Sequence, residues 1–151
     1  MRTKYIISLI LMACIGFIVA CNNVNPKEPT PPTIHYGEDI CELCGMIISE
    51  ENHAAAYLTK DGHGHVFDDI GDMFKSYQDN KEEVTALFVH NYEDKLWMRA
   101  ELTYYVVNEE IHTPMLSGIA AFATEMQAKE FAKKYDSEAL SFDEMKELYE
   151  K

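Results

Sequence analysis

The strongest constraint on this chain is a single Cys-x-x-Cys pair, Cys41 and Cys44, at the start of its folded part. The spacing brings two thiols onto one turn, where they can share a metal ion or form a disulfide. A four-cysteine zinc ribbon needs a second pair, which the chain lacks, so structural zinc would need histidines to complete its ligands. A thioredoxin-like fold places the motif at the start of a helix after a βαβ pattern. Here the apolar, β-branched Ile47 and Ile48 follow the motif and the upstream half of such a fold is missing, so a thioredoxin-like fold is disfavoured.

The first residues have the features of a bacterial lipoprotein signal. Arg2 and Lys4 precede an uncharged apolar run that ends in Ile18-Val19-Ala20-Cys21. This pattern is typical of a secretory signal peptide, and its last four residues resemble a lipobox, in which Cys21 becomes the lipidated N-terminus. The alternative is an uncleaved membrane anchor, but the run is shorter than the roughly 20 residues that span a bilayer. We therefore expect an extracytoplasmic protein whose lipid holds it to a bacterial membrane, either the cell membrane or the outer membrane.

This signal divides the chain into three parts. We expect a signal peptide over 1–20, a lipidated N-terminus and flexible tether over 21–37, and a folded domain over 38–151. The tether is assigned because its residues are rich in Asn and Pro and have no hydrophobic period. Once the signal peptide is removed and Cys21 is lipidated, Cys41 and Cys44 are the remaining thiols. In an oxidising compartment such a pair forms a disulfide or binds a metal.

The charge balance excludes one class of partner. The chain has 26 acidic and 13 basic residues, a net charge of −13, and 47% hydrophobic residues. Removal of 1–20 takes away two basic residues, Arg2 and Lys4, and no acidic one, so the net charge becomes −15. A nucleic-acid binder needs a basic face to contact phosphates, so we expect no nucleic-acid partner. The hydrophobic content suffices for one compact domain, and the acidic surplus favours cations or a basic partner.

Hydrophobic periodicity predicts an α+β domain whose two halves have the same order of strands and helix. The expected elements are strands over 53–59, 65–67 and 85–90 with a helix over 69–78, then strands over 103–107, 119–122 and 139–142 with helices beginning at Thr124 and Asp143. In the first helix Ile70, Met73, Phe74 and Tyr77 share one face. Each half therefore gives the order strand, strand, helix, strand, with helices packed on small sheets.

Sulfur and imidazole side chains near the cysteines suggest a soft metal. Gly45 lets the backbone turn sharply, which would direct Met46 toward the same point as Cys44. Thiolate and thioether ligands together select soft ions, above all Cu(I). Further candidate ligands are Met115, which lies in a loop, Met73, and the two histidines that flank Gly64, His63 and His65. Most methionines at helical spacing fill the core, and turn histidines are usually just solvated.

With these residues in place, the sequence resembles the NosL family, lipoproteins that accompany nitrous oxide reductase. The points of resemblance follow the family's order over about 38–142: the lipobox ending at Cys21, Cys44-Gly45-Met46, Phe67-Asp68-Asp69-Ile70-Gly71-Asp72-Met73, Tyr105-Val106, Thr113-Pro114-Met115 and Ala121-Phe122. The chain departs from the family at Leu116, where Gly is frequent, and at Asp72, where a small residue or Cys is frequent.

The resemblance implies a function, a fold and a set of ligands. It implies a copper chaperone, not an enzyme, that binds one Cu(I) outside the cytoplasm. The partners would be nitrous oxide reductase and the machinery that assembles its copper-sulfide centre. It also implies two related ββαβ units and a structural kinship with the organomercurial lyase MerB. By position, the copper ligands would include Cys44 and Met46, with Met115 and either a histidine or Met73 as candidates.

Two other classes of function stay open at this point. The first is an enzyme, either a thiol-disulfide oxidoreductase that uses Cys41 and Cys44 or a lyase of the MerB kind. A lyase is disfavoured because no third cysteine with an acidic neighbour is present in the domain. The second is a surface lipoprotein in which Cys41 and Cys44 form a permanent structural disulfide.

Overall fold

The structure is a computed structural model that describes residues 28–80 and 83–150. Its elements are β1 (Ala55–Thr59), β2 (Gly64–Phe67), α2 (Ile70–Asn80), β3 (Val84–His90), β4 (Trp97–Arg99), the 3-10 turn η2 (Ala100–Leu102), β5 (Tyr104–Val107), β6 (Ile119–Phe122), α3 (Glu125–Ala132), the 3-10 turn η3 (Lys133–Tyr135), β7 (Ala139–Leu140) and α4 (Phe142–Tyr149). Among the described helices none has the length and apolar character to cross a bilayer. The predicted signal peptide and the lipidation site, Cys21, lie outside the described residues.

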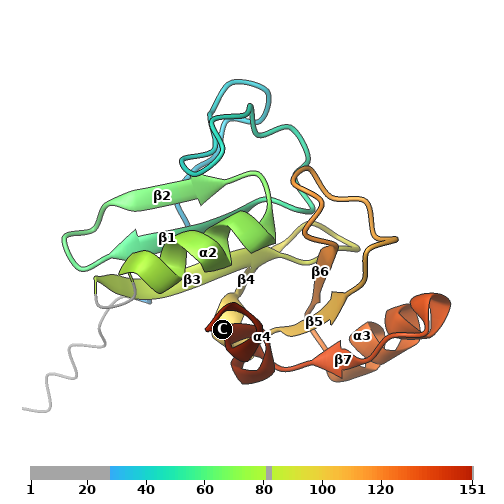
Figure 1. Ribbon diagram of the computed structural model, residues 1–151. Coiled ribbons are helices and arrows are strands. Elements are labelled where there is room, and N and C mark those ends of the chain that lie inside the picture. The colour runs from blue at the N-terminus through green and yellow to red at the C-terminus, as the bar shows by residue number, and fades with distance from the viewer. Residues whose placement is uncertain (1–27, 81–82, 151) are drawn as a thin grey trace, which may run out of the picture.

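The strands form two small antiparallel sheets, as the α+β prediction requires (Figure 1). The first has the order β2-β1-β3-β4 and the second the order β6-β5-β7. In both, the first strand of the unit is central, the second pairs with it as a hairpin, and the third returns after a helix to its other side. The two halves of the chain therefore share the ββαβ topology that the sequence predicts.

Helix α2 packs against the first sheet on one side and against elements of the second half of the chain on the other. Asp69 ends the turn after β2, and its Oδ1 accepts a hydrogen bond from the Gly71 N–H at 2.7 Å, which satisfies a free amide at the start of the helix. Ile70, Met73 and Phe74 are buried, which confirms the predicted apolar face. Burial of each such side chain contributes about 1.5–3 kcal/mol.

The second sheet is buried on both faces. Along β5, Tyr105 joins the core beneath the first sheet, whereas its neighbour Val106 joins a separate core with α3. This alternation is the two-residue period of a strand. Phe74 contacts Tyr105 edge to face, at 5.8 Å between ring centroids, and stacks on Tyr149 of α4 at 5.4 Å. The two units are thus packed together through aromatic rings of α2, β5 and α4.

Three expectations differ from the structure. Strand β4 and the turn after it, at 97–102, were not predicted, since three residues are too few to show a period. The last helix begins at Phe142, and Ser141 caps it through a capping box with Glu144, so the predicted strand over 139–142 is too long and the cap is not Asp143. Ile34 is 8% exposed and belongs to the main core, so packed chain begins within the predicted tether over 21–37.

Candidate metal centre

The segment before β1 folds back on itself and presents both thiols from one loop. An isolated antiparallel bridge joins Ile40 to Ile47. Inside it the Cys41 N–H donates to the Met46 carbonyl at 2.8 Å, and the Gly45 N–H donates to the Cys41 carbonyl at 2.9 Å. Gly45 has a φ of +76°, in the left-handed region that the sharp turn after Cys44 requires. The predicted turn is confirmed, and we call residues 40–47 the cysteine loop.

Glu42 attaches the cysteine loop to the first sheet. Strand β2 is an edge strand, so one row of its backbone groups is not used by the sheet. The Glu42 N–H donates to the Val66 carbonyl at 3.1 Å, and its Oε1 accepts from the Val66 N–H at 3.3 Å. Its Oε2 lies 2.6 Å from His65 Nδ1. The loop is therefore fixed beside the turn between β2 and α2 (Figure 1).

Two carboxylates from that turn and the first turn of α2 meet the thiols. The Cys44 thiol donates to Asp68 Oδ1 at 3.4 Å, and the Cys41 thiol donates to Asp72 Oδ2 at 3.6 Å. One ligand atom from each of the four residues lies within 4.8 Å of the other three. Cys41 and Asp68 are each 1% exposed. We call this group the thiol cluster, and both cysteines in it are free.

The surroundings hold the thiols in their protonated form. Burial raises the pKa of Cys41 to about 12 and also raises the pKa of Cys44, where the charge of Asp68 adds to the effect. Burial likewise raises the pKa of Asp72. Asp68 Oδ2 is buried and has no hydrogen-bond partner among the described residues. A bound cation would offset the lost hydration of these sulfur and oxygen atoms, because they do not gain a full set of hydrogen-bond partners in the fold.

Comparison with known families and structures identifies the chain. A family model described as NosL matches residues 32–149. The chain belongs to the NosL family. A solved structure, the copper chaperone NosL from Shewanella denitrificans, superposes with a TM-score of 0.67 at 24% sequence identity and covers 77% of this chain and 96% of that chain. This likeness confirms the fold. No curated protein matches the chain.

The loop that carries Met115 is tied to the same corner of this NosL chain. Asp69 Oδ2 accepts hydrogen bonds from Thr113 Oγ1 at 2.7 Å and from the Met115 N–H at 3.0 Å. Met115 therefore lies in a loop held by the residue that follows Asp68 of the thiol cluster. Leu116 adopts a φ of +58°, a left-handed conformation that suits Gly, which is the residue expected at this position from the resemblance.

The other predicted ligands occupy different surroundings. Met46 is 53% exposed at the end of the cysteine loop, and Met115 is 38% exposed. Met73 is fully buried in the main core, where its thioether packs as an apolar side chain. His63 and His65 group with Glu42 rather than with the thiols. Of the predicted ligands, the structure brings only Cys41 and Cys44 together into the thiol cluster; the roles of the others stay predictions.

The sequence analysis did not single out Asp68 and Asp72 as candidate ligands. Asp69 does cap α2, but Asp68 turns toward Cys44. Asp68 and Asp72 are four residues apart across a helix start, which is the spacing that places two side chains on one side of a helix. That spacing, beside a Cys-x-x-Cys pair, is the signal that could have revealed them.

Proposed function

We propose that this protein is a lipid-anchored, extracytoplasmic Cu(I) chaperone that supplies copper for the copper-sulfide centre of nitrous oxide reductase. The observation that carries the proposal is the pair of free thiols, Cys41 and Cys44, at the buried end of a loop in a chain of the NosL family. The similar structure from Shewanella denitrificans is that of a copper chaperone. Thiolates are soft ligands that Cu(I) prefers.

Proton exchange gives the site a way to bind and to release its cargo. As copper enters, the S–H bonds of Cys41 and Cys44 break, two copper–sulfur bonds form, and the two protons pass to solvent. Because the thiols have raised pKa values, their protons compete with copper. Return of the protons favours release, as a delivery protein requires.

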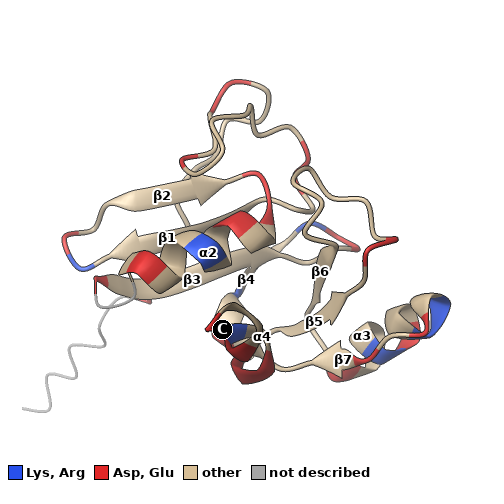
Figure 2. Cartoon of the chain, viewed as in Figure 1, with Lys and Arg blue, Asp and Glu red and all other residues tan. Residues whose placement is uncertain are grey.

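Partial exposure provides the path to a partner. Cys44 is only partly buried, and Met46 and Met115 are accessible to solvent. A receiving ligand can therefore attack the copper from the open side while Cys41 still holds it. The proposed thioether ligands, Met46 and Met115, would complete a mixed, low-coordinate shell. Acidic residues along the cysteine loop, the β2–α2 turn and α2 add an attractive field for a cation (Figure 2).

The anchor and the client are proposals from the sequence. Cys21, preceded by a lipobox-like segment, would be the lipidated residue, and the domain would stay near the membrane where the copper centre is assembled. The client follows from the resemblance to lipoproteins that accompany nitrous oxide reductase. Labelling of the mature protein with a lipid precursor, compared between the unaltered chain and Cys21→Ser, tests the anchor; equal labelling of both would contradict it.

The same pKa shifts argue against the thiol-disulfide oxidoreductase. An exchange catalyst needs a thiolate at neutral pH, and such enzymes lower the pKa of the attacking cysteine. Here burial raises the pKa of both Cys41 and Cys44. Neither thiol lies at a helix N-terminus, since 40–47 is a loop. The pair is therefore suited to holding a soft ion.

A second candidate is a zinc site, and one observation favours it. Asp68 and Asp72 supply two oxygens beside the two sulfurs, and four such ligands match the tetrahedral shell of zinc. Binding of Zn(II) with loss of two protons leaves the net charge of the cluster unchanged, whereas Cu(I) makes it more negative. Competition between the two metals, with the chain limiting, decides which ion the cluster holds.

The deciding experiment is an anaerobic Cu(I) titration of the reduced full chain, with Cys14→Ser and Cys21→Ser in the background so that Cys41 and Cys44 are the only thiols. One equivalent of tightly held Cu(I) is expected, and a tenfold excess of Zn(II) should not displace it. A stoichiometry near zero, or displacement by zinc, would overturn the proposal. Transfer of the bound copper to copper-free nitrous oxide reductase then tests the client.

A further inference from the structure

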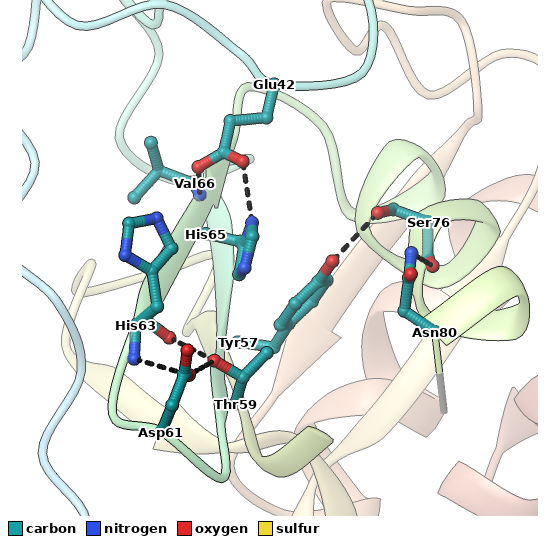
Figure 3. Close-up of polar contacts among 9 residues, drawn as sticks. All are labelled: Glu42, Tyr57, Thr59, Asp61, His63, His65, Val66, Ser76 and Asn80. Atoms are coloured by element: carbon teal, nitrogen blue, oxygen red, sulfur yellow. Dashed lines mark hydrogen bonds and ion pairs between the residues drawn. The ribbon is translucent and has the colours of Figure 1, made fainter. Parts of the chain in front are cut away.

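A second group of ligand atoms, which contains no sulfur, lies at the edge of the first sheet. It comprises Glu42, His63 and His65, and one ligand atom from each lies within 4.8 Å of the other two. Figure 3 shows the two imidazole rings side by side with the Glu42 carboxylate above them. The ring centroids are 4.8 Å apart. We call this group the imidazole cluster.

The backbone holds all three residues in place before any ion arrives. Glu42 is fixed by its two hydrogen bonds to the backbone of Val66. His65 belongs to β2, and its ring lies 4.7 Å from the ring of Tyr57 on the neighbouring strand. The His63 N–H donates to Asp61 Oδ1 at 3.2 Å in the hairpin turn (Figure 3). Ligands that need little rearrangement lose little entropy when they bind.

The imidazole cluster is open to solvent and to ions. It borders a hollow between the β1–β2 hairpin and α2, which is also lined by the acidic side chains of Asp61 and Glu83. Within the described part of the chain the ring of His63 has no hydrogen-bond partner, and the side chain of His65 is 24% exposed. A hydrated cation can therefore reach the three ligands through a field of negative charge.

We propose that Glu42, His63 and His65 form a second metal site, which takes a divalent cation of borderline softness, Cu(II) or Zn(II). Imidazole and carboxylate ligands suit these ions, whereas thiolates select Cu(I). The cation replaces the proton shared by His65 Nδ1 and Glu42 Oε2, and these two atoms separate slightly. Three protein ligands leave positions for water, so the ion exchanges readily. The site needs neither thiol and shares no residue with the thiol cluster.

Electron paramagnetic resonance of Cu(II) tests the assignment, in a full chain whose four cysteines are serine so that thiols neither bind nor reduce the probe. One Cu(II) per chain with coupling to two imidazole nitrogens is expected. The signal should be lost when His63→Gln and His65→Gln are combined. It should persist in the matched control His35→Gln, because His35 is another exposed histidine with a carboxylate neighbour. No binding, or the same two-nitrogen signal in the double variant, would overturn the proposal.

A second arm keeps the test decisive if loss of the thiols unfolds the chain. Calorimetric titration of the reduced chain, with Cys41 and Cys44 intact and serine at positions 14 and 21, should take up one more Zn(II) than the His63→Gln, His65→Gln chain. Equal stoichiometry contradicts the second site. Cu(I) titration of the same double variant measures the thiol cluster separately, so failure of one site is distinguished from failure of the other.

Discussion

The two ligand clusters take residues from the same loop and yet differ in the softness of their ligand atoms and in their exposure. Cys41 and Cys44 belong to the thiol cluster, whereas Glu42, which lies between them in the sequence, belongs to the imidazole cluster. The thiol cluster is largely buried and its sulfurs are soft. The imidazole cluster is largely exposed, and its nitrogen and oxygen atoms are harder. Under the two proposals, neighbouring residues of one loop would bind two different ions.

This difference would let a small acidic domain hold Cu(I) tightly at the thiol cluster and exchange a divalent cation at the imidazole cluster. Burial raises the pKa of the thiols, so only an ion with high affinity for sulfur displaces their protons. The exposed cluster borders a hollow that is also lined by Asp61 and Glu83, so a hydrated ion can reach it. Variants that affect one cluster and spare the other therefore test the separation.

The largest expected effect is that of Cys44→Ser. Loss of a thiolate ligand should lower the Cu(I) affinity by more than about a hundredfold, beyond what loss of a supporting group costs. Divalent-ion binding at Glu42 and the histidines should be unchanged. Competition with a Cu(I) chelator measures the first quantity and calorimetry the second. Unchanged Cu(I) affinity would contradict the role of the thiol cluster.

Asp68→Asn separates copper from zinc within the thiol cluster. The Zn(II) affinity should fall about 10–100-fold, because a carboxylate near the ion is lost. The Cu(I) affinity should not fall, since the charge of Asp68 raises the pKa of Cys44 and so opposes thiolate formation. The matched control is Asp79→Asn, because Asp79 is an exposed carboxylate of α2 outside both clusters, and it should leave both affinities unchanged. A parallel loss of Cu(I) affinity in Asp68→Asn would make Asp68 a copper ligand.

The pH dependence of Cu(I) binding follows from the raised thiol pKa values. At neutral pH Cys41, with a pKa of about 12, and Cys44 both carry protons, which copper must displace. The apparent Cu(I) affinity should therefore rise with pH, about tenfold per pH unit for each proton released to solvent. Chelator competition between pH 6 and pH 8 gives the slope. A flat profile would mean that the thiols are already ionised.

The thioethers should have a smaller effect. Met46→Leu and Met115→Leu should each weaken Cu(I) binding about tenfold, near the lower end of what loss of a supporting ligand costs. Met126→Leu is the matched control, because Met126 is 75% exposed on α3. Equal affinities in all three variants would remove both thioethers from the copper shell.

The smallest expected effect tests the loop that both clusters share. Gly45 has a φ of +76° and open space around it, so Gly45→Ala strains only the backbone, by about 1–2 kcal/mol. A lower Tm with weaker binding of both ions is expected. Thermal unfolding and the two titrations check it, and loss of only one ion would show that the cysteine loop positions the clusters independently.

Most of the fold was predicted because its hydrophobic patterns extend over many residues. The apolar face of α2 and the two hairpins follow from patterns over many residues, and the repeated ββαβ order follows from them. Strand β4 was missed because pairing to β3 alone defines it.

The site was predictable where chemistry is local and not where it is long-range. Cys41, Cys44 and the turn at Gly45 are adjacent in the chain, so their association follows from spacing. The approach of Asp68 and Asp72 depends on how the cysteine loop attaches to β2, which Glu42 determines through Val66. The histidines were candidates to complete the shell of the sulfurs, but the structure groups His63 and His65 with Glu42.

The most direct test is X-ray absorption spectroscopy of the reduced chain, with serine at positions 14 and 21, loaded with one equivalent of Cu(I). The expected result is a copper shell dominated by sulfur that is identical in the unaltered chain and in the variant that combines His63→Gln with His65→Gln. A shell dominated by nitrogen, lost in that double variant, would place the copper on the imidazole cluster and contradict the assignment of the thiols.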